Sequence, residues 1–368
     1  MPPHLVPLSS GYHDVNALIG NWPAAAASWL TRKGGNVLLA VDSHTGGNPT
    51  RIVVGGLHLP DEAQGVDGAR NWLRQNADWV RTRLVHEPRG GGLTCAVVPV
   101  MSQEDGCDIG AVILEPGSYP PMCGHCMIGF ASVIVELGLI PGLWQSNEDE
   151  TRFRIRTPAG PVGVTARRSP GKPTEITLTN VGSFVVKSGT CHLPTGDIPV
   201  DLVYGGDYYI TADADRIGLS LERDNATGIV SLARQIKAAY TEGGVIDPLS
   251  GQNLDVYQVM FFRRLPGEQP RARIVVVAPP GVIDRSPCGT GSSALFAFLC
   301  GRKEVAADQT LTTESIIGST FTVRCQGVAM RAGRQEVTPL LTGTAFINGF
   351  LTIAADGRDA LADGFAPL

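Results

Sequence analysis

Two short stretches, PMCGH at residues 121–125 and SPCGTG at residues 286–291, contain the same cysteine-glycine turn. Each turn is followed by an apolar run, MIGFASVIV over 127–135 and ALFAFL over 294–299. These runs predict helices over 126–137 and 292–299, which Gly138 and Gly301 end. A helix without a polar face must be surrounded by protein. The sequence therefore predicts two buried helices, each introduced by a Cys-Gly turn.

Short strand-like runs surround both predicted helices and are separated by Gly, Pro and Asn turns. In the first half they cover residues 36–41, 51–54, 93–100, 109–115, 153–156, 163–166 and 175–178. In the second half they cover residues 201–204, 208–210, 256–262, 274–277, 321–323 and 345–347, with an amphipathic outer helix over 226–240. The halves look like distant copies, so the pattern predicts two similar α/β lobes.

The domain boundaries follow from where these patterns change. Residues 1–36 do not alternate and carry a helix-like patch over 24–30, so we interpret them as an appended arm. The first lobe is expected over 37–195 and the second over 196–344. The C-terminal residues, about 345–368, are expected to return and complete the first lobe.

Composition excludes several classes of function. The 368 residues carry a net charge of −5 without a basic cluster, which disfavours nucleic acid and anionic membranes as partners. The apolar run around 127–135 is far shorter than the ~20 residues of a bilayer span. The first ten residues lack a basic signal sequence, and the 8 cysteines are scattered, so reduced thiols and a cytoplasmic location are expected. The expected partner is a small molecule.

The position of the two thiols predicts their chemistry. A cysteine at a helix N-terminus faces unpaired backbone N–H groups and the positive end of the helix dipole, which favour the thiolate. The neighbouring N–H groups form two anion-binding pockets into which a substrate carboxylate would fit. These N–H groups belong to Gly124, His125, Gly289 and Thr290.

Two thiols are what a cofactor-free inversion of a stereocentre requires. One group removes a proton from one face of the carbon while the other delivers a proton to the opposite face. Donors fixed around the carboxylate stabilise the carbanion-like transition state. We expect Cys123 and Cys288 to be this acid/base pair. Asp284 is a candidate acceptor for the substrate ammonium, or simply a cap of its own turn, and His125 is expected to contact substrate or orient Cys123.

The motifs together resemble the proline racemase superfamily and occur in that family's order from about residue 36 onward. They are DSHTGG at 42–47, EPRG at 87–90, MCGH at 122–125 and DRSPCGTG at 284–291. The resemblance implies the diaminopimelate-epimerase-like fold, α/β (α+β), with two pseudo-symmetric lobes. Each lobe would be a curled, mostly antiparallel sheet around a central buried helix. It also implies catalysis by Cys123 and Cys288 without metal or pyridoxal cofactor, and a homodimer.

The resemblance also separates related reactions. Relatives that dehydrate trans-3-hydroxyproline carry Thr at the second thiol position, so Cys288 argues against that activity. The stretch VAPPG at 277–281 is more like hydroxyproline 2-epimerases than proline racemases. We therefore expect an amino-acid racemase or 2-epimerase, with hydroxyproline ahead of proline. Three departures from the family pattern leave the substrate open: Asn48 in place of Glu, Gly91 in place of His, and Asp207 in place of Asn.

Other interpretations compete with this one. Cys123-Gly-His-Cys126 matches a dithiol oxidoreductase motif, but that interpretation leaves Cys288 unexplained. A catalytically retired amino-acid-binding protein is the alternative outside enzymes. A zinc site is not expected, because Cys123, His125 and Cys126 are too close in sequence and no second ligand pair follows. The remaining cysteines are interpreted as buried structural residues: Cys95, Cys107, Cys191, Cys300 and Cys325.

Overall fold

The architecture is that of a computed structural model, which describes residues 22–33, 37–104, 106–144 and 148–367. The helix-like patch predicted over 24–30 lies in helix α2, Trp22–Lys33, and is confirmed. The rest of the predicted arm, residues 1–21 and 34–36, lies outside the described residues. None of the helices in the described part of the chain is long and apolar enough to cross a membrane.

The first lobe is a closed ring of eight strands. They follow the order β1-β2-β3-β4-β5-β6-β7-β18, and pairing of β18 with β1 closes the ring. Hydrophobic residues of these strands face inward, as the alternating burial along β5 shows. The strands are β1 Val37–Thr45, β2 Asn48–Gly55, β3 Cys95–Val100, β4 Ile109–Leu114, β5 Glu150–Thr157, β6 Gly160–Arg167, β7 Glu175–Thr179 and β18 Arg334–Ala354.

The second lobe repeats this plan. Its strands follow the order β18-β17-β16-β14-β13-β10-β9-β8, and a bridge between Ser183 and Val337 returns the start of β8 to β18. The strands are β8 Phe184–Leu193, β9 Gly196–Tyr204, β10 Tyr208–Asp213, β13 Gln258–Leu265, β14 Arg271–Ala278, β16 Leu311–Glu314 and β17 Thr320–Arg331. Two short strands, β11 Val245–Ile246 and β12 Asn253–Leu254, pair with each other, and a third, β15 Val282–Ile283, pairs with β14. The two similar, mostly antiparallel lobes are therefore confirmed.

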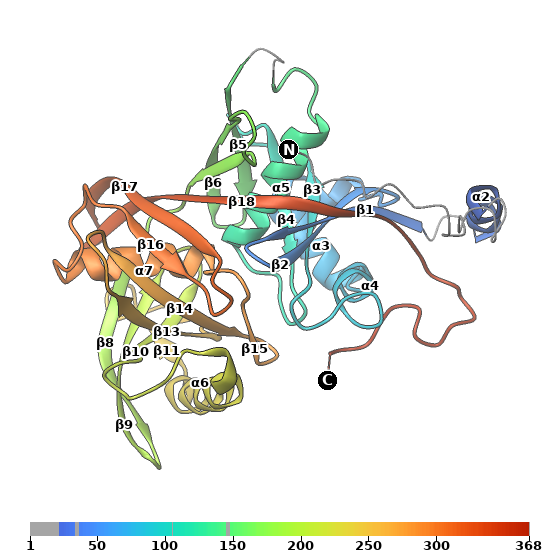
Figure 1. The fold of residues 1–368 in the computed structure, drawn as a ribbon. Helices are drawn as coiled ribbons and strands as arrows, with labels where there is room; N and C mark the ends of the chain where they lie inside the picture. The colour runs from blue at the N-terminus through green and yellow to red at the C-terminus, as the bar shows by residue number, and fades with distance from the viewer. Residues whose placement is uncertain (1–21, 34–36, 105, 145–147, 368) are drawn as a thin grey trace, which may run out of the picture.

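Strand β18 belongs to both lobes. Its first residues pair with β17, residues 340–344 pair with β7, and residues 345–354 pair with β1. Figure 1 shows it as one long strand that runs from one lobe into the other. Because a single 21-residue strand takes part in both sheets, it fixes how the lobes sit against each other. The chain after it contacts the first lobe again, where Phe365 bridges to Glu87.

Each lobe encloses one helix, as the sequence predicts. Helix α5, Gly124–Leu137, is buried from residue 124 to 135, and α7, Gly289–Gly301, is buried from 289 to 299. Both begin two or three residues earlier than predicted, so the glycine after each cysteine is the first helical residue. Gly138 caps α5 with a left-handed φ of 61°, as expected. Gly301 is the last residue of α7, and Arg302 is its cap.

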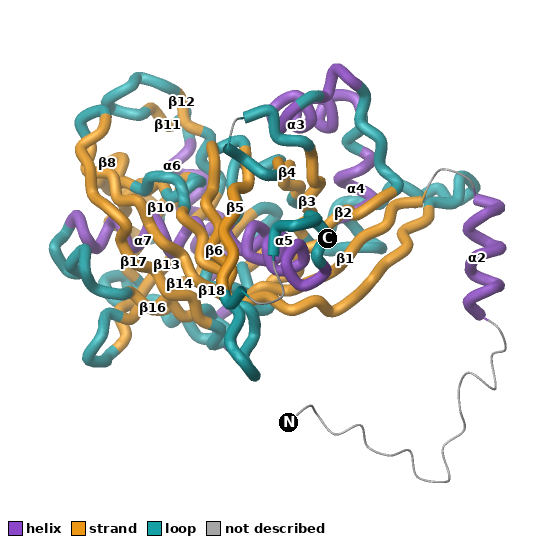
Figure 2. The backbone as a smooth tube through the Cα atoms, turned by 90° about the horizontal axis from the view of Figure 1, so that it is seen from above, coloured by secondary structure: helices purple, strands orange, loops and turns teal. Residues whose placement is uncertain are grey.

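Outer helices cover the lobes (Figure 2). The predicted helix over 226–240 is confirmed as α6, Ala226–Thr241, which packs on the second lobe. Helices α3, Gly65–Asn76, and α4, Trp79–Val85, cover the first lobe and were not predicted. Short 3-10 turns precede α3 and α6, η1 at Asp61–Ala63 and η2 at Arg223–Asn225.

The predicted division at 195/196 stays a prediction. The hairpin of β8 and β9 spans this boundary, since Leu193 pairs with Gly196. Both of its strands lie in the sheet of the second lobe. A division placed before β8 would keep the hairpin whole.

Candidate active site

The two Cys-Gly turns open into one cavity between the lobes. The cavity is narrow: the space in it for the centres of water-sized molecules is about 40 Å³, and one water needs about 10–15 Å³. Both lobes contribute to its walls. The first lobe supplies Asn48, Cys95, Glu115, Cys123, Gly124 and His125, and the second supplies Tyr209, Gln258, Asp284, Cys288, Gly289 and Thr290. Every residue predicted for the site therefore lines this cavity.

The N-termini of the two buried helices touch, backbone against backbone. A Cβ added to Gly124 would lie 2.6 Å from Cα of Gly289, and a Cβ added to Gly289 would lie 2.7 Å from Cα of Gly124. Only glycine permits this approach. The contact brings the N-caps Cys123 and Cys288 into the lining of the same cavity, so the positive ends of both helix dipoles lie at it.

Cys123 is paired with the histidine that follows it. Its Sγ lies 3.2 Å from Nδ1 of His125. The amide nitrogen of Asn48 lies 3.2 Å from Nε2 of the same ring. Since Oδ1 of Asn48 accepts the N–H of Arg285 at 3.1 Å, the amide must donate to Nε2. In the neutral ring the proton is therefore on Nδ1, where it donates to Cys123.

This pairing favours the thiolate form of Cys123. Burial raises the pKa of the thiol, but hydrogen bonding by Cys126 and the charge of His125 outweigh burial, and the pKa lies well below its usual range. The pKa of His125 is raised well above its usual value, because the neighbouring thiolate outweighs the burial that would lower it. The two groups thus stabilise each other's charge. Of the two cysteines, Cys123 is the one in the thiolate form, which can accept a proton.

Cys288 has an unusual backbone. Its φ of 55° is in the left-handed region, which costs a non-glycine residue about 1–3 kcal/mol. A chain of hydrogen bonds holds it there. The N–H of Cys288 donates to Oγ of Ser286 at 3.1 Å, and Oγ of Ser286 donates to Oδ1 of Asp284 at 2.9 Å. Asp284 also accepts the N–H of Ser286, so it does cap its own turn while lining the cavity.

Tyr209, at the start of β10, reaches Cys288 from the second lobe. Its hydroxyl lies 3.4 Å from Sγ of Cys288 and 2.5 Å from Oγ1 of Thr290. Burial raises the pKa of the Cys288 thiol strongly, the charge of Asp284 raises it further, and the Tyr209 hydroxyl acts in the opposite direction. Cys288 is consequently a thiol under conditions in which Cys123 is a thiolate. One sulfur is ready to accept a proton and the other to donate one.

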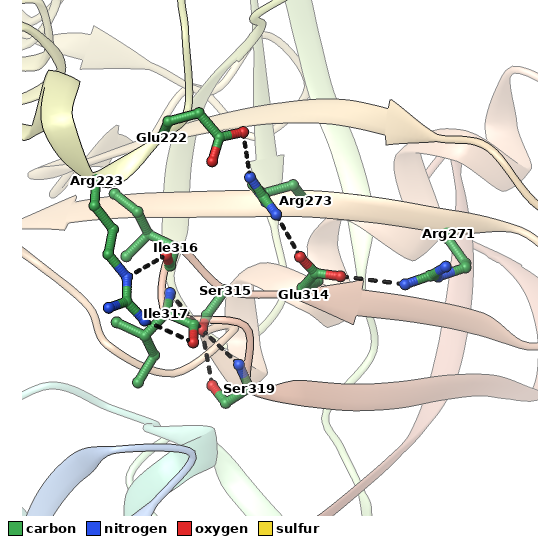
Figure 3. Close-up of polar contacts among 9 residues, drawn as sticks. All are labelled: Glu222, Arg223, Arg271, Arg273, Glu314, Ser315, Ile316, Ile317 and Ser319. Atoms are coloured by element: carbon green, nitrogen blue, oxygen red, sulfur yellow. Dashed lines mark hydrogen bonds and ion pairs between the residues drawn. The ribbon is translucent and has the colours of Figure 1, made fainter.

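The loop 315–319 connects the second Cys turn to the first lobe by hydrogen bonds. Oγ of Ser319 donates to the carbonyl of Gly46, in the turn between β1 and β2, at 2.8 Å. Arg223 holds the same loop by donating to the carbonyls of Ile316 and Ile317 (Figure 3). An ion-pair network continues from the loop across β14 and β16. It consists of Glu222, Arg271, Arg273 and Glu314.

The cavity offers backbone N–H groups and carboxyl groups, while none of the described residues that line it is Lys or Arg. The first turns of α5 and α7 place the N–H groups of Gly124, His125, Gly289 and Thr290 where anions bind. Glu115 and Asp284 supply carboxyl groups, and burial raises the pKa of both. This combination suits a small zwitterion that carries a carboxylate and an ammonium.

Comparison with known proteins shows the family of the chain. The family model described as "Proline racemase" matches residues 40–366. The chain belongs to the proline racemase family. A 4-hydroxyproline 2-epimerase of Streptosporangium roseum is 34% identical over 334 residues, which cover 89% of this chain and 98% of that protein. A proline racemase of Clostridioides difficile is 32% identical over 330 residues, which cover 89% of this chain and 97% of that protein.

A solved structure extends the likeness to three dimensions. A hydroxyproline epimerase from Agrobacterium vitis, with bound trans-4-hydroxy-L-proline, matches with a TM-score of 0.80 and 31% identity. The match covers 90% of this chain and 96% of that chain. Family membership and these relatives identify the protein as an isomerase.

The three residues that differ from the family's sequence pattern lie at different distances from the cavity. Asn48 lines it and contacts His125. Gly91 is outside its lining, and a Cβ there would meet nothing within 4 Å. Asp207 is also outside the lining and is buried. Its carboxyl accepts from the hydroxyl of Tyr257 at 2.7 Å, and burial raises the pKa of this carboxyl to about 7. The change that touches the cavity is therefore Asn48.

Sequence reasoning missed several lining residues, among them Cys95, Glu115, Tyr209 and Gln258. They lie on or next to strands, where nothing in the local pattern separates a cavity residue from a core residue. Conversely, His44 of the DSHTGG stretch and His86, which precedes the EPRG stretch, have structural surroundings. His44 stacks on Phe346, and Nε2 of His86 lies 2.8 Å from the carbonyl of Pro116. Cys123 and Cys126 are both free thiols, not a disulfide.

Proposed function

We propose that the protein is a cofactor-independent racemase or 2-epimerase of proline-type amino acids, with hydroxyproline preferred to proline. The observation that carries this proposal is that Cys123 and Cys288, at the N-termini of two touching helices, line the same narrow cavity. The preference for hydroxyproline is supported by Ala278 and Pro279, which line the cavity and belong to the epimerase-like stretch. The hydroxyproline epimerase among the solved relatives gives further support.

The proposed reaction begins with the carboxylate of the substrate at the N–H groups of the two helix turns. The Cys123 thiolate removes the α-proton, and the electron pair of the broken C–H bond spreads into the carboxylate, where the N–H groups stabilise it. The Cys288 thiol then delivers its proton to the opposite face of the carbon. Asp284 faces the substrate ammonium. The reverse reaction uses the same two sulfurs with their roles exchanged.

Incubation in heavy water tests this proposal. The protein is given each enantiomer or epimer of proline, 4-hydroxyproline and trans-3-hydroxyproline, and α-deuterium, optical rotation and ketone products are followed. We expect α-deuterium and inversion together, fastest with 4-hydroxyproline. Formation of a pyrroline without inversion would instead indicate a dehydratase. Binding without any α-exchange would indicate an amino-acid-binding protein without catalysis.

The different charge states of the two sulfurs predict unequal labelling. Alkylation requires the thiolate, and the pKa of Cys123 is lowered while that of Cys288 is raised. At pH 7 we expect iodoacetamide to label Cys123 faster than Cys288, as measured by peptide mass spectrometry. Labelling of Cys288 should accelerate as the pH rises, since its thiol ionises only on the alkaline side. Labelling of Cys123 should stay flat over the same range.

The variant Tyr209→Phe sharpens this test. The Tyr209 hydroxyl lowers the pKa of Cys288, so its removal should slow labelling of Cys288 still further and leave Cys123 unchanged. Tyr240→Phe, on the outer helix α6, is the matched control. Equal labelling of the two cysteines in the unmodified protein, or faster labelling of Cys288, would contradict the assignment of the thiolate to Cys123.

A further inference from the structure

A second cluster of cysteine and histidine lies against the candidate active site. Cys95, at the start of β3, comes close to His125 and Cys126 at the start of α5. One ligand atom from each residue lies within 4.8 Å of the other two, and all three side chains are buried. Neither Cys95 nor Cys126 exchanges a proton with the substrate in the proposed reaction, although Cys126 lowers the pKa of Cys123 by hydrogen bonding. Their proximity to the histidine therefore calls for another explanation.

The spacing of these atoms suits a tetrahedral cation bound by sulfur and nitrogen. Zn–S bonds of about 2.3 Å and Zn–N bonds of about 2.0–2.1 Å place the two ligand atoms about 3.6 Å apart in a tetrahedral site. Sγ of Cys126 lies 3.5 Å from Nε2 of His125. The separation required by zinc is thus already present between these two groups.

The histidine is also oriented as a metal ligand. A ligating imidazole usually donates its other N–H to an acceptor that fixes the ring. Nδ1 of His125 lies 3.2 Å from Sγ of Cys123, so the other ring nitrogen, Nε2, is the one that lies near Cys126. The amide of Asn48, which now donates to Nε2 at 3.2 Å, is the group that a cation would displace.

We propose that Cys95, His125 and Cys126 bind a thiophilic divalent cation, with Zn²⁺ as the reference ion, and that the bound cation inhibits the enzyme. Thiolate and imidazole are the ligands that favour Zn²⁺ over Mg²⁺ or Ca²⁺. Binding forms two S–Zn bonds and one N–Zn bond, and it releases to solvent the protons of the two thiols and, where the His125 ring is charged, the proton on Nε2. A fourth position remains open for water or for the sulfur of Cys123.

Inhibition follows from what the cation would do to Cys123; this part rests on the proposed function. Sγ of Cys123 lies 3.9 Å from Nε2 of His125, so a cation bound at that nitrogen is next to the proposed base. Ligation of this sulfur in the fourth position would occupy its lone pair and remove the base. This cation site therefore differs from a cofactor site, because the bound cation inhibits the reaction and does not support it.

Cobalt and zinc titrations test the proposal on the reduced, full-length protein after treatment with EDTA. Co²⁺ serves as the spectroscopic probe, because thiolate ligands give it a charge-transfer absorption. We expect one Co²⁺ per chain with that absorption, displaced by Zn²⁺. In Cys95→Ala the affinity should fall at least about 100-fold, since one of three protein ligands is lost. Cys191→Ala, a buried cysteine in the second lobe, is the matched control.

The activity arm compares each protein with its own metal-free rate. Zn²⁺ should inhibit the unmodified protein and Cys191→Ala, and EDTA should restore the rate, while Cys95→Ala should need at least about 100-fold more Zn²⁺. If Cys95→Ala does not fold, Cys95→Val replaces it. Binding of Co²⁺ without the thiolate absorption, or equal binding by all variants, would overturn the site. Cobalt binding does not depend on turnover, so failure of the proposed function alone would leave that result intact.

Discussion

Replacing Cys288 with alanine is expected to lower the rate of α-carbon inversion by about 10²–10⁴-fold, the usual contribution of one general acid or base. The variant keeps Cys123 with its lowered pKa. We therefore expect it still to exchange the α-proton of one enantiomer with heavy water, because one base suffices to remove and return a proton on the same face. Polarimetry measures the inversion and mass spectrometry the exchange.

The mirror variant completes the test. Cys123→Ala should also lose inversion, and any exchange that remains should occur with the other enantiomer, because the proposed mechanism places the two sulfurs on opposite faces of the α-carbon. Cys325→Ala, outside the cavity lining, serves as the control. Inversion at the normal rate in either cavity variant would exclude the two-thiol mechanism. Exchange of the same enantiomer by both variants would exclude their placement on opposite faces.

The sequence was sufficient to predict the two buried helices, because their signal is local. An apolar run with no polar face can only be interior, and a Cys-Gly turn before it places a thiol on the helix dipole. Because this signal is local in the sequence, it also identified Cys123, His125 and Cys288 as candidate site residues. Helix α3 carried a local signal too, since Val66, Ala69 and Leu73 are buried at helical spacing. The glycines within α3 made this helical pattern hard to identify in the sequence.

What the sequence did not predict depends on contacts between distant segments. Cys95 reaches His125 only because β3 packs against α5 in the closed ring, and Tyr209 reaches Cys288 only because the start of β10 lies near the first turn of α7. Strand β18 closes the first lobe by pairing residue 354 with residue 37, which lie far apart in the sequence. No local periodicity encodes such a register. The same limit explains why the zinc-like cluster was not expected: its third ligand is about thirty positions away from the other two in sequence.

Gly124→Ala is expected to lower kcat/KM by about 100-fold while leaving the fold intact. Alanine suits the helical conformation at this position, so the effect comes from the contact between the helices. The new Cβ would lie 2.6 Å from Cα and 3.0 Å from the carbonyl carbon of Gly289. These are backbone atoms, so no side-chain rotation relieves the overlap, and the two N-termini must separate. A displacement of about 1 Å between catalytic groups costs about 10²-fold in rate.

Steady-state kinetics and thermal unfolding measure the effect together. Gly301→Ala is the matched control, because this glycine ends α7, has an ordinary φ, and would place a Cβ in open space. It should change neither rate nor stability appreciably. Normal kcat/KM in a folded Gly124→Ala would show that the helix contact does not set the separation of the sulfurs. Loss of the folded state would be checked by circular dichroism before the rate is interpreted.

The double variant Gly124→Ala/Gly289→Ala decides whether both glycines act through this one contact. A Cβ on Gly289 would meet Cα of Gly124 at 2.7 Å, so either substitution alone opens the same interface. Once the interface is open, the second methyl group meets less resistance, and the combined loss of kcat/KM should be smaller than the product of the single losses. A fully multiplicative loss would mean that each glycine acts separately, for instance Gly289 through Leu341, whose Cδ2 would lie 2.7 Å from the new Cβ.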